Sequence, residues 1–341
     1  MRGRLPLKAA LAALAVVVLH AAPAAADPPR PTDYRSTVTS VTPDTGGIQA
    51  EIVGGDAFLQ LTVDGHEVVV EGYGDEPYLR FRKDGTVERN RRSTATYLNQ
   101  SRNAKVDLPP QADNDAAPRW EKVADGGSYS WHDHRVHWMG NGKPPGVQAG
   151  DVVQAWTVRL SVDGAPGSIT GNLVLEAGVS PLPWIVLGLV AAGAAVWLGR
   201  KRPAEVAPWA VLIAAVGSLV VGFGQYRVAP AGSGVNPLLI IVPAFAVGAG
   251  ALGALARKRT TVAPSMTLAA AAAVIGWCFL RLDVLWKPVL PTTLPYDLDR
   301  AITAVAFALA VAGAGLIVWG GALRLPRMTG AVATSGGGEP R

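Results

Sequence analysis

Five long apolar stretches in the second half of the chain constrain the fold more than any other feature. Each is close to the roughly 20 residues that a helix needs to cross the hydrocarbon core of a bilayer. Gly, Ala, Val, Leu and Ile dominate them. They cover residues 183–199, 206–224, 236–256, 263–280 and 301–322. We therefore expect an all-α membrane domain of five transmembrane helices over residues 183–322.

Short basic clusters beside these stretches predict the direction of the chain. They stand at 200–202 after the first stretch, at 257–259 after the third, and at Arg324 and Arg327 after the fifth. Lys and Arg favour cytoplasmic loops, so the clusters and a disordered tail over 323–341 are expected in the cytoplasm. The N-terminal half then lies outside the plasma membrane. This placement accounts for much of the formal net charge of +5, so the charge does not indicate nucleic-acid binding.

The first 26 residues have the pattern of a secretory signal peptide. Arg2, Arg4 and Lys8 precede a short apolar run, and Ala24–Ala26 offer a small-residue cleavage site before Asp27. An uncleaved anchor is the alternative. A cleaved signal would export residues 27–178, in agreement with the basic clusters.

The membrane stretches lack ionisable residues at their centres. Such residues are costly in a bilayer and usually mark transport or proton pathways. Small residues instead suit close packing of helices. We expect an anchor bundle that moves no ion or solute. The outer loop at 281–300 is either a platform under the exported domain or an ordinary connection.

Residues 27–178 are predicted to be all-β. Asp64-Gly65 and Asp84-Gly85 each separate two β-rich runs, as in two-residue hairpins. A third pair surrounds 163–167, and a polar, proline-rich loop covers 97–120. We expect seven to nine antiparallel strands in an immunoglobulin-like β-sandwich. The single cysteine, Cys278, lies in an apolar stretch, so the exported domain has no disulfide.

The segment SWHDHRVHWM at 130–139 holds three of the five histidines. The candidate metal ligands are His132, His134 and His137. On a strand, His132 and His134 share one face, and His137 joins them only through a bulge or the strand's end. Two imidazoles at this spacing suit one metal ion, and imidazole ligation favours Cu(II) or Zn. Export favours copper. Metal affinity is expected to fall as pH drops through about 6.5.

Other ligands are weaker candidates. Met139 offers a soft donor, but one methionine does not make a Cu(I) site, and only its residue type suggests His66. Two readings without a metal stay open: a partner-binding surface centred on Trp131 and Trp138, and a structural cluster with an Asp133–Arg135 ion pair.

No enzymatic motif is present. The sequence has no phosphate-binding loop, HExxH motif or dinucleotide fingerprint. Ser130 near His132 lacks a nucleophile elbow. We expect no catalytic residues and a protein that is not an enzyme.

The segments GYGDEPYLRF, STATYLN and WHDHRVHWM resemble an uncharacterised family of actinobacterial envelope membrane proteins with a WHDHRxHWM motif. The resemblance spans most of the chain, and the histidine motif is its most specific part. It implies an association with secreted Ig-like copper-handling proteins, one of which would be an exported partner. The copper-resistance Ig-like family binds Cu(II) through an N-terminal amine and histidines. Here Asp27 is followed by two prolines, and no histidine lies nearby.

The sequence thus favours a membrane-anchored extracytoplasmic binding module that handles a metal, with copper preferred. The alternative is a structural or interaction protein whose β-domain recognises another exported partner.

Overall fold

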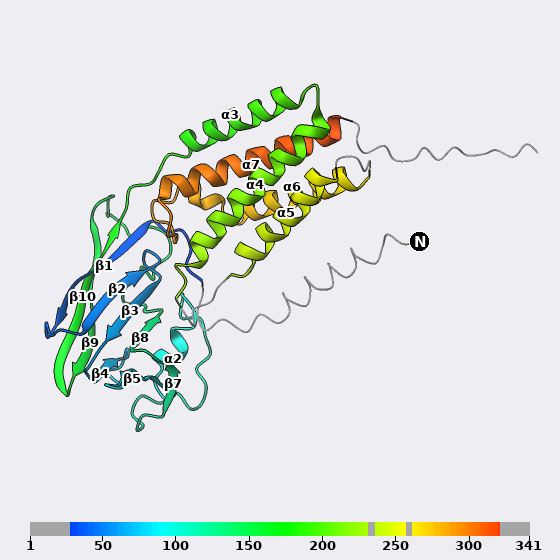
Figure 1. Cartoon of the computed structure of the whole chain (residues 1–341). Coiled ribbons are helices and arrows are strands. Elements are labelled where there is room, and N and C mark those ends of the chain that lie inside the picture. Colours follow the sequence, from blue (N-terminus) through cyan, green and yellow to red (C-terminus); the bar gives the residue numbers. More distant parts are fainter. Residues whose placement is uncertain (1–27, 231–235, 257–260, 321–341) are drawn as a thin grey trace, which may run out of the picture.

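The computed structural model describes residues 28–230, 236–256 and 261–320. The predicted signal peptide and cytoplasmic tail, the basic cluster at 257–259, Arg324 and Arg327 lie outside the described residues. A β-domain stands at one end of a helical bundle (Figure 1). The expected order, a β-domain followed by apolar helices, is therefore confirmed.

Ten strands and one short helix form the β-domain in the described part of the chain. They are β1 (Tyr34–Thr42), β2 (Ile48–Val53), β3 (Phe58–Val63), β4 (Val68–Glu71), β5 (Pro77–Phe81), β6 (Val87–Asn90), α2 (Ala95–Leu98), β7 (Trp120–Ala124), β8 (Ser128–Trp131), β9 (Val152–Val162) and β10 (Ala165–Leu175). A seven-stranded sheet has the order β1-β10-β9-β4-β5-β6-β7, and a three-stranded sheet has the order β2-β3-β8. This division of seven against three does not confirm an immunoglobulin-like sandwich.

One hydrophobic core lies between the two sheets. Leu59 and Leu61 on β3 contribute from the smaller sheet, and Leu79, Leu160 and Leu173 contribute from the larger one. All five side chains are almost completely buried. Burying a leucine of this kind stabilises the fold by about 1.5–3 kcal/mol, so the domain has a substantial core without a disulfide.

Two of the three predicted hairpins are confirmed as strand pairs. β5 and β6 pair around Asp84-Gly85, but the connection covers residues 82–86 and only Gly85 of the two has positive φ, so the expected two-residue turn is not the one observed. Strands β9 and β10 are joined at Asp163-Gly164. Both of these residues have positive φ, 49° and 84°, as a type I′ turn requires.

The hairpin predicted at Asp64-Gly65 is wrong. Strand β3 pairs with β2 and β8, whereas β4 pairs with β5 and β9. The connection crosses from one sheet to the other because both edges of β3 are already paired. Its four residues, 64–67, also exceed a two-residue turn. The hairpin that β3 does form is with β2, through Gly54 and Gly55.

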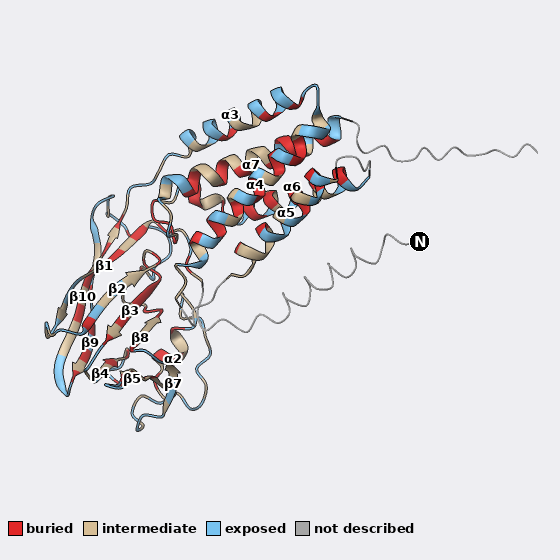
Figure 2. Ribbon diagram, in the orientation of Figure 1, coloured by how far each residue is buried: buried red, intermediate tan, exposed pale blue. Residues whose placement is uncertain are grey.

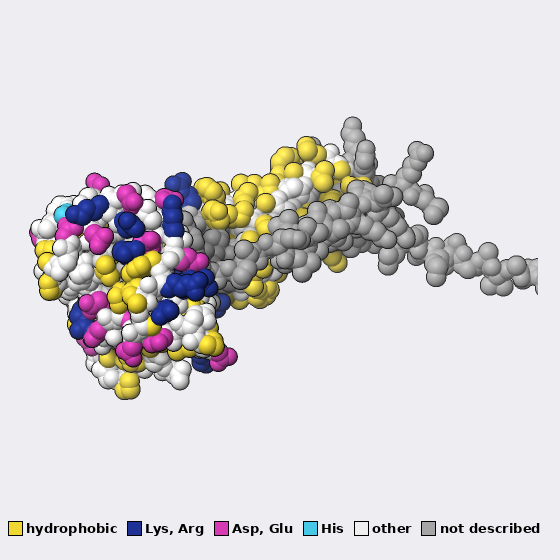
Figure 3. All heavy atoms as spheres, turned by 90° about the horizontal axis from the view of Figure 1, so that it is seen from below, with side chains coloured by type: hydrophobic (Ala, Val, Ile, Leu, Met, Phe, Trp, Pro, Cys, Tyr) yellow, Lys and Arg dark blue, Asp and Glu magenta, His cyan; other side chains and the backbone are white. Residues whose placement is uncertain are grey.

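Among the described residues, five helices are long and apolar enough to cross a membrane. They are α3 (Leu182–Gly199), α4 (Pro203–Tyr226), α5 (Leu238–Leu255), α6 (Val262–Phe279) and α7 (Tyr296–Trp319). Many of their large apolar residues are exposed, and most of the buried ones are small. The share of buried residues is lowest in α3, which is largely pale blue and tan in Figure 2. Seen from below, charged side chains of both signs are scattered over the β-domain, and the described part of the bundle that is visible is mainly apolar (Figure 3).

The loop between α6 and α7 serves as a platform for the β-domain. Thr32 and Val289 exchange two backbone hydrogen bonds, at 3.0 and 3.2 Å. The Lys287 ammonium pairs with Asp33 at 2.6 Å. Of the two alternatives for the 281–300 loop, a platform under the β-domain or an ordinary connection, the structure therefore shows the platform. The opposite end of the bundle carries the α3–α4 turn with the basic residues 200–202 (Figure 1).

Candidate metal centre

The histidine motif is not a continuous strand, so this part of the sequence interpretation is wrong. β8 ends at Trp131, and residues 132–139 turn away from the sheet. Asp133 makes the turn, because its carboxylate accepts hydrogen bonds from the backbone N–H of Arg135 at 3.0 Å and from the Trp131 indole at 2.8 Å. The expected Asp133–Arg135 ion pair is present at 2.8 Å.

This turn brings all three imidazoles of the motif together. Each of His132, His134 and His137 offers one ring nitrogen, and these atoms lie within 4.8 Å of one another. The ring of His137 is the nearest to that of His132, with centroids 4.7 Å apart. The His134 ring lies 5.7 and 5.5 Å from the other two. The strand's end thus brings in His137, which strict alternation would have sent to the other face.

Backbone carbonyls hold two of the three rings. Nε2 of His134 lies 2.9 Å from the Ser101 carbonyl, and Nδ1 of His137 lies 3.2 Å from the Trp138 carbonyl. A carbonyl only accepts, so each of these nitrogens must carry the proton. The other nitrogen of each ring, Nδ1 of His134 and Nε2 of His137, then bears a lone pair. Orientation of this kind is typical of metal-bound histidines.

Buried nitrogens without partners are the most unusual feature of the cluster. Within the described structure, no hydrogen bond of good geometry reaches either ring nitrogen of His132 or Nε2 of His137, although the Ala57 backbone acts on the His132 ring. His132 is 2% exposed and His137 is 0% exposed. A buried polar group left unpaired costs about 1–3 kcal/mol. Such groups call for an explanation, and the capacity to bind an ion between them is one.

Burial keeps the imidazoles neutral. It lowers the pKa of His132 to about 4 and that of His137 to about 2, and the nearby charge of Arg102 acts in the same direction. The carbonyl of Ala57 partly opposes the effect on His132. Burial also lowers the pKa of His134. Since imidazole binds a metal only when neutral, these lowered pKa values favour the form of the rings that a metal would bind.

The residues present fit a transition metal. Three nitrogens bound to one Zn²⁺ at about 2.0–2.1 Å in tetrahedral geometry would lie roughly 3.4 Å apart. The observed limit of 4.8 Å requires only a small inward movement of the rings. Imidazole ligands suit zinc and copper. Three protein nitrogens leave a fourth position for water or another donor.

The surroundings of the cluster come from distant parts of the chain. Phe58 packs edge-on against His132, and Tyr73 stacks on His134 with centroids 5.6 Å apart. The long loop after α2 supplies Ser101 and Arg102, and Arg102 pairs with the buried Asp56 at 2.5 Å. The loop is predicted from the sequence, but the proximity of Ser101 and Arg102 to the histidines is not, because nothing in their spacing links them to the motif.

The other predicted site residues lie elsewhere or face inward. Met139 is 43% exposed. Both ring nitrogens of His66 are engaged, one by Asp163 at 2.8 Å and one by the Gly46 carbonyl at 3.0 Å. Trp131 is 3% exposed and packs in the core, so it offers no docking surface. Trp138 is half-buried, and its indole donates to the Gly142 carbonyl.

Comparisons of this chain with protein-family models, with curated proteins and with solved structures found no match.

Proposed function

We propose that this protein is a membrane-anchored extracytoplasmic metal-binding module, which holds Cu(II) or Zn through His132, His134 and His137 and acts in copper handling at the cell envelope. One observation carries the proposal. Three imidazoles converge in one cluster, and two of them, His132 and His137, are buried with ring nitrogens that have no hydrogen-bond partner in the described structure. One metal ion would satisfy Nε2 of His137 and one nitrogen of His132 together, whereas a purely structural cluster leaves both of these buried nitrogens without a partner.

The ligand set favours a divalent ion over Cu(I). Soft thioether and thiolate donors select Cu(I). The cluster contains none, because Cys278 is buried in the bundle and Met139 is exposed. Copper is preferred to zinc because of the extracytoplasmic location and because the motif resembles a family associated with copper-handling proteins.

The orientation of the chain is also a proposal. The β-domain stands at the end of the bundle opposite the basic residues 200–202. The positive-inside rule would place that basic end in the cytoplasm, with the β-domain outside. A cytoplasm-only fluorescent reporter fused after Arg341 should fluoresce. The orientation would be contradicted if this fusion does not fluoresce while a reporter that works only outside the cytoplasm, fused at the same position, is active.

Calorimetry on the full chain in lipid nanodiscs tests the metal site. We expect 1:1 binding of Cu(II) or Zn²⁺ with Kd below ~10 μM, the weakest affinity we would accept for a dedicated site. Electron paramagnetic resonance of the Cu(II) form should show coupling to imidazole nitrogens. His132→Ala and His137→Ala should each weaken binding at least a hundredfold. His66→Ala is the matched control and should leave it unchanged.

Two outcomes would overturn the metal proposal. One is wild-type binding no tighter than ~10 μM, the same threshold as above. The other is tight binding that survives His132→Ala and His137→Ala. The β-domain would then be better explained as a structural or interaction domain for another exported protein.

A further inference from the structure

The seam between strands β1 and β2 is the second unexplained feature of the β-domain. These strands follow one another along the chain, and each is the outermost strand of its sheet. In the described residues, β1 pairs only with β10 and β2 pairs only with β3. A backbone hydrogen bond from Ser36 N–H to the Gly55 carbonyl, at 2.9 Å, closes the seam at the membrane end. Above this bond no ladder joins the two strands.

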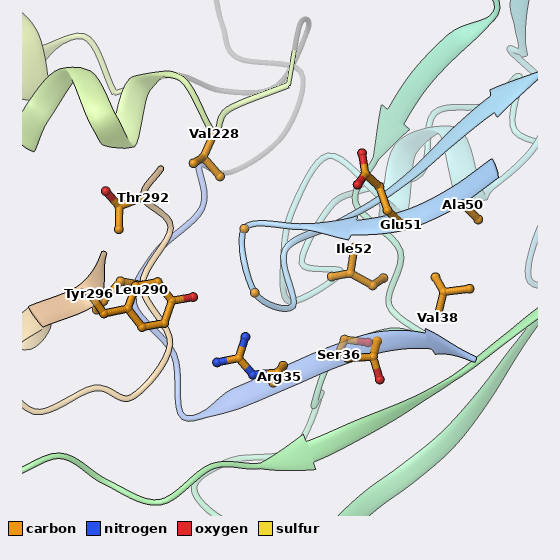
Figure 4. Close-up of a pocket in the computed structure, with 13 residues that line it drawn as sticks. Arg35, Ser36, Val38, Ala50, Glu51, Ile52, Val228, Leu290, Thr292 and Tyr296 are labelled. Atoms are coloured by element: carbon orange, nitrogen blue, oxygen red, sulfur yellow. The ribbon is translucent and has the colours of Figure 1, made fainter. Parts of the chain in front are cut away.

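Two adjoining cavities run along this seam. The one nearer the membrane, about 430 Å³, lies between Ser36 and Val38 of β1 and Ala50 and Ile52 of β2 (Figure 4). The outer one, about 790 Å³, extends to the turn after β1. Ala50 and Glu51 line both cavities, so the two form one groove. Nine residues of β1 give an edge about 30 Å long.

The walls of the groove are suited to an extended polypeptide. Val38, Val41, Ala50 and Ile52 are half-buried and pack at the margin of the hydrophobic core. An added strand would cover them with every second side chain. Unpaired backbone N–H and C=O groups of the β1 edge would supply the hydrogen bonds, as in other complexes that add a strand to a sheet.

The edges also lack most devices that prevent pairing with other chains. Natural edge strands are often protected by Lys, Pro or a bulge. Neither β1 nor β2 contains Lys or Pro, and one bulge interrupts β1 between Val38 and Ser40. Thr, Ser and Val occupy most of β1, and these residues suit strand pairing.

Charge on the groove favours a basic partner. Asp44 and Glu51 are the charged residues that line the outer cavity. Arg35, in the cavity nearer the membrane, is already paired with Glu176 at 2.6 Å. A Lys or Arg on the incoming segment would find acidic partners at the outer end, and an acidic segment would be repelled there.

We propose that the β1–β2 groove binds an extended segment of an exported polypeptide, with apolar residues at alternate positions and a basic residue towards the outer end. The segment pairs as an additional strand on the free edge of β1. This inference does not depend on the metal site.

A peptide library tests the proposal. Random nonapeptides displayed on phage would be selected against the full chain in nanodiscs, with empty nanodiscs to remove background. We expect enrichment of alternating apolar residues with a Lys or Arg at one end. Fluorescence anisotropy would then give the affinity of the best peptide, and the same peptide with alternate backbone amides N-methylated should bind at least tenfold more weakly.

A pair of protein variants completes the test. Ala50→Arg fills the groove and should weaken peptide binding at least tenfold, whereas Thr157→Arg, at an exposed position of β9, should not change it. The proposal fails if no peptide is enriched, if N-methylation has no effect, or if Ala50→Arg binds as the wild type does. If Ala50→Arg instead changes only the phospholipid that copurifies, the groove is a lipid site and the proposal is overturned. The N-methylated peptide keeps the test valid even if Ala50→Arg folds poorly.

Discussion

The β-domain buries large side chains together with many polar groups, whereas the membrane bundle buries mainly small residues. In the β-domain, His132, Asp133 and His137 lie inside next to the aliphatic core. In the bundle, the interior is built from Ala, Gly and Val, and buried charges such as Arg281 and Asp299 stand near the end that faces the β-domain. Water surrounds the β-domain and competes with its polar contacts, whereas lipid surrounds the bundle.

This difference indicates where binding chemistry can reside. Buried polar groups are expensive and are kept when something pairs with them. Buried Ser218 and Thr267 in the bundle each donate to a carbonyl of their own helix at 2.9 and 2.8 Å. Unpartnered buried atoms occur in both parts of the described structure, but three of them gather on two neighbouring imidazoles of the β-domain, where the candidate ligand nitrogens lie within 4.8 Å of one another. The predictions below test this contrast, from the largest expected effect to the smallest.

Removing the buried carboxylate of Asp133 should have the largest effect on stability. Asp133 is 0% exposed and holds Arg135, whose side chain is 21% exposed. Asp133→Ala leaves the Arg135 guanidinium without its ion-pair partner and should lower the free energy of unfolding by about 3–5 kcal/mol. Urea unfolding of the full chain, followed by tryptophan fluorescence, measures it.

The matched control is Glu121→Ala, which removes a surface carboxylate that contacts Arg89 at 3.6 Å. Exposed ion pairs contribute about 0–1 kcal/mol. Equal losses in the two variants would mean that the buried polar network of the β-domain is no more important than its surface charges.

Metal affinity should fall by no more than about tenfold between pH 7.5 and 5.5. Three exposed imidazoles, each with a pKa near 6.5, would lose about a thousandfold in affinity at pH 5.5. With pKa values of about 4 and about 2, His132 and His137 stay neutral there. The pKa of His134 is also lowered, so its protonation costs at most about tenfold.

This prediction differs from the expectation, drawn from sequence alone, that affinity falls as pH drops through about 6.5. Zn²⁺ calorimetry at pH 7.5 and 5.5, in buffers that do not bind zinc, measures it. A thousandfold loss would show that the imidazoles are solvated, and that the β-domain interior is not the dry environment on which the contrast with the bundle depends.

Local patterns predicted most of the fold and part of the site. The five apolar helices follow from composition and length, and the strand pairs around Asp84-Gly85 and Asp163-Gly164 follow from the turn residues between β-rich runs. The crossing between β3 and β4 was not predictable, because it depends on which edges β2 and β8 occupy. The sequence named His137 as a candidate ligand and named the strand's end as one way for it to join the others, and the structure brings the three together in that way. It could not show that the Asp133 side chain makes the turn there.

Packing of the bundle should be sensitive at one glycine of α7 and tolerant at another. A Cβ at Gly313 would lie 2.5 Å from Cγ2 of Val211, whereas a Cβ at Gly315 would meet nothing within 4 Å. Gly313→Ala should destabilise the bundle by about 1–3 kcal/mol through overpacking. Gly315→Ala should be neutral or more stable by up to about 1 kcal/mol, since Ala favours a helix. Thermal unfolding in detergent compares the two, and similar melting temperatures would contradict close packing of small residues.

The smallest effect should come from His66, the histidine outside the cluster. Its hydrogen bond to Asp163 raises the pKa of His66 above 6.5 in the folded protein. A raised pKa means that the folded state binds the proton more tightly than the unfolded state. The stabilisation is therefore fully present below pH 6.5 and is lost as pH rises through the folded-state pKa. The melting temperature of the wild type should exceed that of His66→Gln at pH 6, and the difference should shrink by pH 9. A difference that widens with pH would show that the Asp163 contact does not favour the charged ring. His66 lies at the surface while the cluster is buried, so metal affinity should be the same in both proteins. The two kinds of histidine in the β-domain therefore respond to pH in opposite ways. His66 stabilises the fold when its ring is protonated, and the buried histidines bind a metal only when their rings are neutral.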